Sequence, residues 1–137
     1  MLSKNEVKHI RSLHQKKYRK KEKKFLVEGK KSLDELIKSE LNIHAVYYTK
    51  ESEKKHGIPE EVESISYLVD KKEMEKISQL QTPPGELAIV SMPVNIMEFS
   101  VTGGQCILLD QIQDPGNAGT IIRSADHFGV RDIVFSP

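Results

Sequence analysis

One short segment constrains the fold of this chain more than any other. Four apolar residues, Cys106–Leu109, form an unbroken run of the kind found in strands of a covered parallel sheet. The pair Pro115-Gly116 then breaks the run. We expect a helix directly afterwards, with Asn117 as its N-cap, because the asparagine side chain can accept a hydrogen bond from an unpaired backbone N–H of the first turn.

The expected helix has two different faces. An apolar stripe with helical spacing should pack against the sheet; it consists of Ala118, Ile121, Ile122, Ala125 and Phe128. Arg123 points the other way, one turn after Gly119, and a glycine within a helix costs about 0.5–1 kcal/mol relative to alanine. Either a substrate or second chain approaches this turn closely and Arg123 binds its anionic oxygens, or Arg123 is an ordinary solvated arginine beside a tolerated glycine.

The run DPGNAGTIIRSADHFGV resembles the first motif of the SpoU family of RNA ribose 2′-O-methyltransferases, whose pattern is Asn-x-Gly-x-x-x-Arg after a strand. That family belongs to the knotted SPOUT class. Upstream, FLVEGKKSLDELI resembles the Glu-Gly segment of the small substrate-binding domain that often precedes the catalytic domain, and LQTPPGELAIV resembles the closing strand of that domain. The three matches follow the order of the family and touch nearly the whole chain.

The resemblance implies catalytic roles for two residues. Arg123 would help to activate the ribose 2′-hydroxyl, and Asn117 would shape the turn of the active site. A free arginine stays protonated and is a poor general base, but it can hold a phosphate and orient the hydroxyl towards the methyl donor. The general base is therefore unassigned. His127 is either a helper in this step or a surface histidine without a role.

The resemblance also implies S-adenosylmethionine as methyl donor, in a pocket formed by two later motifs of a C-terminal knot. Residues 105–137 hold only about one βαβ unit, which is too little to bury an independent core. We therefore expect the chain to be an N-terminal fragment that lacks the cofactor pocket and is inactive alone. The family further implies that the full-length enzyme is a homodimer.

Positive charge is concentrated at the amino terminus. Residues 1–24 hold ten Lys or Arg and two acidic residues, a net charge of +8, whereas residues 25–137 carry −7. This density suits the neutralisation of RNA phosphates, with a tyrosine available to stack on a base. The alternative is a solvated basic arm without a fixed partner. The candidate RNA-binding residues are Arg11, Lys16, Lys17, Tyr18, Arg19, Lys20, Lys21, Lys23 and Lys24.

The preceding part of the chain alternates between helix and strand. Periodicity predicts helices over residues 5–13 and 32–38, strands over 25–27, 43–49 and 87–90, and a helix that Asp70 and Glu73 begin, with Met74, Ile77 and Leu80 on its apolar face. This alternation predicts an α/β fold. We expect a three-layer RNA substrate-binding domain over 1–92 that resembles ribosomal-protein sandwiches, a linker over 93–104, and the opening βαβ unit of a SPOUT domain over 105–137. Glu28 either serves the family's Glu-Gly feature or simply caps the end of its strand.

Composition narrows the remaining classes. The single cysteine, Cys106, excludes an intramolecular disulfide and a CxxC metal site, and it is expected to be buried, in a reducing compartment. Without a signal segment or a long apolar run, we expect a cytoplasmic protein that binds neither membrane nor metal. Two functions stay open: a tRNA or rRNA methyltransferase, and a non-catalytic RNA-binding module. A dinucleotide site is a distant third, because Gly116-x-x-Gly119 lacks the G-x-G-x-x-G spacing.

Overall fold

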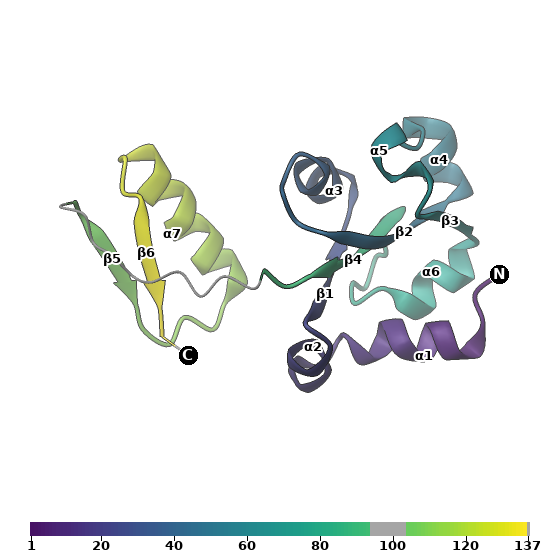
Figure 1. Cartoon of the computed structure of the whole chain (residues 1–137), viewed down its shortest axis with the longest axis horizontal. Helices are drawn as coiled ribbons and strands as arrows, with labels where there is room; N and C mark the ends of the chain where they lie inside the picture. Colours follow the sequence, from purple (N-terminus) through teal and green to yellow (C-terminus); the bar gives the residue numbers. More distant parts are fainter. Residues whose placement is uncertain (94–103, 137) are drawn as a thin grey trace. The chain divides into compact units, whose positions relative to one another are not determined.

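A computed structural model describes residues 1–93 and 104–136 of the chain. The chain divides into two compact units, residues 1–94 and 95–137 (Figure 1). The expected linker spans residues 93–104. Only its first and last residues are described by the structure, and residues 94–103 lie outside the described residues. Each unit is considered by itself below.

Unit 1 is built around one mixed sheet. Its strands are β1 (Lys24–Glu28), β2 (Ile43–Thr49), β3 (Ser66–Val69) and β4 (Glu86–Ser91), in the spatial order β1-β4-β2-β3. β4 is antiparallel to both β1 and β2, whereas β2 and β3 are parallel. The last strand of the unit is therefore inserted between the first two, so the sheet is complete only when β4 has been placed.

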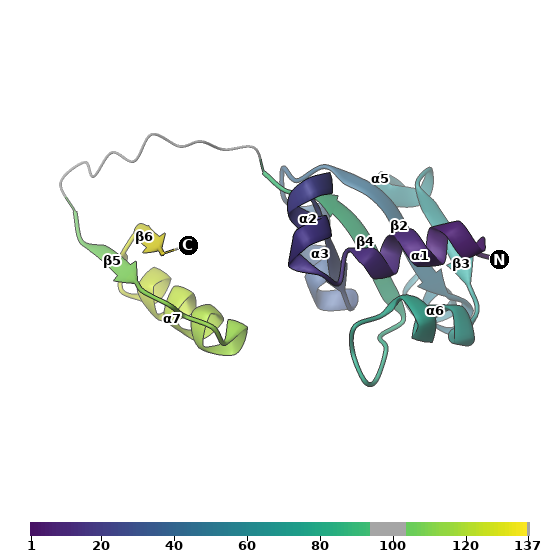
Figure 2. The same cartoon turned by 90° about the horizontal axis from the view of Figure 1, so that it is seen from below.

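Helices cover both faces of this sheet. They are α1 (Lys4–Ser12), α2 (Lys16–Glu22), α3 (Lys30–Ile37), α4 (Lys50–His56), α5 (Glu60–Glu63) and α6 (Lys71–Ile77). α1 and α6 lie side by side on one face, and α3 and α5 lie on the other (Figures 1 and 2). The three-layer α/β architecture expected from the sequence is confirmed.

Two apolar clusters separate the layers. Alternate residues of β2 and β4 point to opposite faces, so both central strands are buried on both sides. One cluster packs α1 and α6 against the sheet and contains Ile10, Leu13, Ala45, Tyr47, Val69, Met74, Ile77, Leu87 and Ile89. The other packs α3 and α5 and contains Leu33, Leu36, Val46, Tyr48, Val62, Ala88 and Val90.

Capping interactions fix several helix starts. The predicted Asp70–Glu73 capping box begins α6, and an equivalent Ser3–Glu6 box begins α1. The hydrogen bonds from Ser3 lower the pKa of Glu6. Leu80 does not continue the apolar face of α6, because the helix ends at Ile77; Leu80 is exposed in the loop that follows.

Glu28 fastens that loop to the end of β1. Its carboxylate accepts a hydrogen bond from the Ser78 hydroxyl and another, of 2.9 Å, from the backbone N–H of Gln79. The next residue, Gly29, has a φ of +93° at the start of α3, a backbone conformation that glycine adopts readily. These two hydrogen bonds support the structural interpretation of Glu28, in which the residue caps the end of its strand.

Unit 2 is a βαβ unit, as the sequence predicts. It consists of β5 (Cys106–Leu109), α7 (Pro115–His127) and β6 (Asp132–Phe135), and its two strands are parallel. The expected N-cap is wrong. Asp114 caps α7 by accepting a hydrogen bond of 2.8 Å from the backbone N–H of Asn117, which is itself the third helical residue. Pro115 begins the helix because its fixed φ suits the first helical position and its missing N–H needs no partner there.

Burial in unit 2 is also less than the sequence predicts. Ala125 is buried, and Ala118 and Ile121 are half-buried, but Ile122 and Phe128 of the expected stripe are exposed by 44% and 78%. Cys106 is exposed as well. A two-stranded sheet with a single helix covers one face of its strands and leaves the other uncovered, which explains both corrections.

The turn before β4 approaches α4 closely at one glycine. A Cβ atom added to Gly85 would lie 2.5 Å from the Cβ of Ser52, too close for two carbon atoms. The Gly85 carbonyl also accepts a hydrogen bond of 2.8 Å from the backbone N–H of Thr49. Backbone and helix are therefore in contact here, with no room for a side chain.

We expect Gly85→Ala to lower the free energy of unfolding by about 1–3 kcal/mol, because the added methyl group forces the turn away from α4. Urea unfolding of the full chain measures this change. Thr82→Ala, at an exposed position of the same loop, is the control and should stay within about 0.5 kcal/mol of the parent. Equal stability of the two variants would contradict the close contact.

Candidate nucleic-acid interface and active-site turn

The lysine-rich run, for which the sequence pattern predicts no secondary structure, is a helix. α2 spans Lys16–Glu22 and ends at Lys23, whose φ of +53° places it in the left-handed region. Lys24 is already the first residue of β1. Four ammonium groups on exposed residues of one short helix form what we call the lysine face; they belong to Lys16, Lys17, Lys20 and Lys21.

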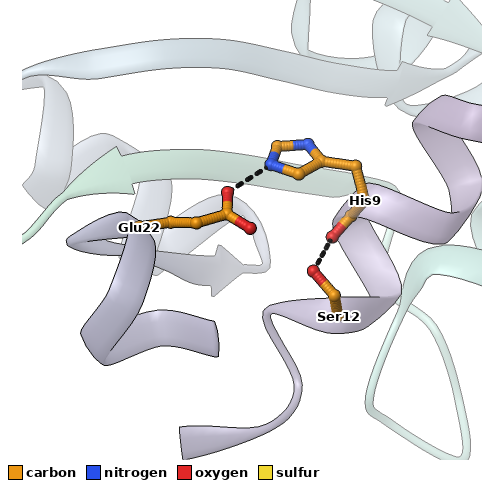
Figure 3. A network of polar contacts seen from close by, with 3 residues as sticks. All are labelled: His9, Ser12 and Glu22. Carbon is orange, nitrogen blue, oxygen red and sulfur yellow. Dashed lines mark hydrogen bonds and ion pairs between the residues drawn. The ribbon is translucent and has the colours of Figure 1, made fainter. Parts of the chain in front are cut away.

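Side-chain contacts of Glu22 and Arg19 hold α2 against the end of α1. His9 Nε2 lies 2.6 Å from Glu22 Oε2, and within α1 the Ser12 hydroxyl donates to the His9 carbonyl at 2.6 Å (Figure 3). The Arg19 guanidinium donates to the backbone carbonyls of Leu13 and His14, at 3.1 and 2.6 Å. α2 is thus fixed at both its middle and its last residue.

These contacts divide the candidate RNA-binding residues. Arg19 and Tyr18 are half-buried, and Arg19 satisfies carbonyls at the end of α1, whereas the lysine face is free to meet phosphates. Arg11 lies elsewhere, on a pocket of about 540 Å³ between α1 and the end of α6. His44 lies near Lys24. The partial burial of the His44 ring, and secondly the positive charge of Lys24, lower the pKa of His44.

Arg123 is exposed on α7, as the sequence predicts. Its guanidinium donates to the Thr120 hydroxyl at 3.3 Å, and that hydroxyl donates to the Gly116 carbonyl at 2.9 Å. A Cβ added to Gly119 would lie 3.5 Å from Arg123 Nη1, so the arginine side chain runs back over the glycine. Among residues 1–93 and 104–136, no carboxylate forms an ion pair with Arg123.

Sequence reasoning did not identify Thr120 as part of this turn. Thr120 precedes Arg123 by three residues, and this spacing places the two side chains on the same face of a helix. The spacing alone could have predicted that they are neighbours. Asn117 is exposed in the first turn of the helix. His127 stacks edge-to-face on Phe128, with ring centroids 5.2 Å apart. No hydrogen bond joins His127 to Arg123.

A second pocket, of about 520 Å³, lies at the carboxyl ends of β2 and β3. It is bounded by the start of α4, the start of α6 and the turn of residues 82–85. Glu86, 4% exposed, is one of the lining residues, and its carboxylate accepts a hydrogen bond from the Ser52 hydroxyl. We call this pocket the edge pocket.

Tyr48 lies opposite Glu86 in the pairing of β2 with β4. Burial first, and then the charges of Glu86 and Asp34, raise the pKa of Tyr48 to about 12, so its phenol is neutral at physiological pH. The Tyr48 hydroxyl is buried and has no hydrogen-bond partner within the part of the chain that the structure describes.

The described residues contain no group of three His, Cys, Asp or Glu side chains placed to hold a metal ion. In the same part of the chain, no helix combines the length and the apolar character needed to span a bilayer.

Comparison with protein families matches both units. Residues 4–88 match the model of the MRM3-like substrate-binding domain, and residues 104–137 match the SpoU rRNA methylase family. The 23S rRNA (guanosine(2553)-2′-O)-methyltransferase RlmP of Bacillus subtilis is 33% identical over 130 residues, which cover 93% of this chain and 50% of that protein.

Solved structures resemble the chain over almost its whole length. A protein from Porphyromonas gingivalis assigned to the TrmH family of RNA methyltransferases is 34% identical, with a TM-score of 0.78, covering 98% of this chain and 52% of that one. An rRNA methyltransferase from Sinorhizobium meliloti with bound AdoMet is 26% identical, with a TM-score of 0.73, covering 98% and 53%. The chain thus spans about half the length of these relatives, and it belongs to the SpoU (TrmH-like) family of RNA methyltransferases, with an MRM3-like substrate-binding domain as its first unit.

Proposed function

We propose that this chain is the RNA-recruiting domain and the first catalytic element of an enzyme that transfers a methyl group from S-adenosylmethionine to a ribose 2′-hydroxyl of rRNA or tRNA. The observation that carries the proposal is the exposed Arg123 guanidinium, which lies over Gly119 without a carboxylate partner among the described residues. An arginine neutralised by a carboxylate would have little attraction for an anion. A free one is available to an RNA phosphate.

The role of Arg123 follows from its charge and position. Its guanidinium stays protonated, so it binds the phosphate of the target nucleotide and holds the neighbouring ribose in place instead of removing a proton. Thr120 orients the guanidinium through its hydroxyl. Asn117 lies one and a half turns earlier and helps to shape the same end of the helix. The proton acceptor is not assigned to a residue of this chain.

RNA recruitment is the role of unit 1. The lysine face supplies four exposed positive charges on a helix that His9–Glu22 and Arg19 hold still. Since phosphate contacts depend on charge and carry little sequence information, this face gives affinity for rRNA and tRNA alike. A non-catalytic RNA-binding module would use the same face, but it would leave the exposed Arg123 without a role.

S-adenosylmethionine needs an enclosed, concave site. β5 and β6 do not enclose one, because Leu108 and Phe135 are exposed by 71% and 46%. The residues of unit 2 therefore do not fit the cofactor by themselves. We propose that the cofactor pocket depends on further parts of the family's length, that the complete enzyme is a homodimer, and that it acts in the cytoplasm.

In a full-length enzyme that contains these two units, Arg123→Ala should lower kcat for RNA methylation by about 100-fold or more, because charge stabilisation at the reacting nucleotide is lost. Transfer of tritium from labelled S-adenosylmethionine to RNA measures this. Arg123→Lys should retain part of the activity through its charge. Arg131→Ala, which removes another exposed arginine of unit 2, is the matched control; an Arg123→Ala enzyme as active as this control would reject the role.

The 137-residue chain alone should neither bind S-adenosylmethionine nor methylate RNA, because unit 2 does not enclose a cofactor site. Isothermal titration of the chain with S-adenosylmethionine and the same tritium assay check this expectation. Measurable transfer by the chain alone would show that a functional cofactor site exists without additional sequence.

The double substitution Lys20→Gln/Lys21→Gln should weaken RNA binding and flatten its salt dependence. If both lysines contact phosphates of single-stranded RNA, the slope of log K against log[salt] should fall in magnitude by about 1.4. Fluorescence anisotropy over a salt series gives the slope. Lys31→Gln/Lys38→Gln removes the same charge from two exposed positions, one in α3 and one at its C-cap, and should change the slope much less. Equal slopes for the two variants would contradict the lysine face.

A further inference from the structure

We propose that the edge pocket binds one unpaired RNA base that presents N–H donors, guanine above all, and that Glu86 recognises its Watson–Crick edge. The inference rests on the proposed function, since it assumes that unit 1 binds RNA. It adds base specificity, which neither the lysine face nor Arg123 provides.

Sheet topology creates the pocket. The parallel strands β2 and β3 end side by side at Thr49 and Val69, and β4 begins at the same edge with Glu86. The close contact of Gly85 with Ser52 sets the turn of residues 82–85 against α4. The resulting volume, about 520 Å³, lies within the range of roughly 300–1,000 Å³ typical of small-ligand sites.

Glu86 gives the pocket a specific acceptor. It is 96% buried, yet the only donor that reaches its carboxylate among the described residues is the Ser52 hydroxyl. An ionised carboxylate has about four acceptor sites, and the Ser52 hydroxyl occupies one of them. No Glu86 oxygen is fully buried without a partner among the described residues, so a ligand that carries N–H groups into the pocket would take the place of solvent at the remaining acceptor sites.

The charges around the pocket favour a base over a phosphate as the group inside it. Its cationic residues are Lys50, Lys55 and Lys71, its acidic residues are Glu51, Asp70, Glu75 and Glu86, and His56 completes the ionisable set. The acidic groups outnumber the lysines, so an anion would gain little from entering. The three lysines are exposed, and they can reach the phosphates on either side of an inserted base.

Apolar side chains line the same space as Glu86. Val69 and Met74 come from the core, and Pro83 and Pro84 come from the turn. A nucleobase matches such a lining, because its two faces are apolar and its polar groups lie on its edges. Unstacked bases are recognised in single-stranded RNA through their faces and their Watson–Crick edges.

Guanine fits a carboxylate best among the four bases. Its Watson–Crick edge places the N1–H and N2–H₂ donors next to each other, so that both can bind one carboxylate. Adenine, cytosine and uracil each have donors on one ring position of that edge only. The expected preference is guanine first, with inosine, which lacks the 2-amino group, bound less tightly.

Short RNAs test the preference without altering the protein. Fluorescence anisotropy at fixed salt compares the full 137-residue chain binding UUGUU, UUIUU, UUAUU and UUUUU. We expect UUGUU to bind about tenfold or more tighter than UUAUU, which is the discrimination typical of one bidentate contact, with UUIUU between them. Equal affinities for the four RNAs would overturn the proposal.

Glu86→Gln tests the acceptor. It should remove the preference for UUGUU and leave the affinity for UUUUU unchanged, because only the base-specific contact is lost. Glu60→Gln, an exposed carboxylate on α5 outside the pocket, is the matched control and should keep the preference. Urea unfolding verifies that the variant is folded; if it is not, the four RNAs with the unaltered chain still decide.

The rim has its own matched pair. Lys71→Gln should weaken binding of all four RNAs and flatten the salt dependence, whereas Lys72→Gln, exposed on the same helix but outside the pocket, should do neither. A guanine preference that survives Glu86→Gln would overturn the role of Glu86. Binding of free GMP as tight as that of UUGUU would identify a mononucleotide site and overturn recognition of RNA.

The failures are distinguishable. If the four RNAs bind equally but the lysine-face substitutions still flatten the salt dependence, the pocket proposal fails and RNA recruitment by unit 1 stands. If the chain binds no RNA at any salt concentration, both fail.

Discussion

The insertion of β4 between β1 and β2 is the constraint on which the rest of unit 1 depends. Residues Leu87, Ala88, Ile89 and Val90 are at most 4% exposed, so this strand contributes to the clusters on both faces. Because β4 is antiparallel to β1 and β2, its first residue lies beside the last residues of both. One edge of the sheet therefore collects Glu28, Thr49 and Glu86. Both loop anchors, Glu28 and the Gly85 turn, and the edge pocket follow from that arrangement.

The parts of this fold that the sequence predicts are those in which burial imposes a period. β2 and β4 carry runs of apolar and β-branched residues, and α1, α3 and α6 carry apolar stripes, so all five were found within a few residues of their observed bounds. The Asp70–Glu73 capping box was predicted for the same reason, since its two reciprocal hydrogen bonds need two residue types at a fixed spacing. α2 and α4 were missed because neither has a stripe: Lys16–Glu22 has no buried residue at all, and its helix depends on His9, Glu22 and Arg19.

Predictions for the candidate sites were less complete. A sequence pattern indicates which chemical groups are present, but it does not indicate which neighbours surround each group in the folded chain. The exposure of Arg123 and its position beside Gly119 followed from helical periodicity. The hydrogen-bond partners of Arg123 and Arg19 could not be predicted in this way. Arg123 donates to the Thr120 hydroxyl, and Arg19 donates to backbone carbonyls at the end of α1. Glu86 illustrates the limit most clearly. In the sequence it begins a strand after Pro83-Pro84-Gly85, and only the contact with Ser52 from α4 shows that its carboxylate is buried.

The two RNA-binding sites that we propose for unit 1 use different physical modes of binding. The lysine face lies on α2, at the amino end of β1, and the edge pocket lies where β1 ends and β4 begins, so the two occupy opposite ends of the sheet. Phosphate contacts position an RNA, whereas base contacts specify it. An RNA strand that meets both must run along the domain, and its affinity then depends on salt while its preference among sequences does not. The lysine face and the edge pocket both have fixed positions within unit 1. This favours the use of one for phosphates and the other for a base, because a contact made by a rigid site costs less ordering entropy than a contact made by a flexible arm.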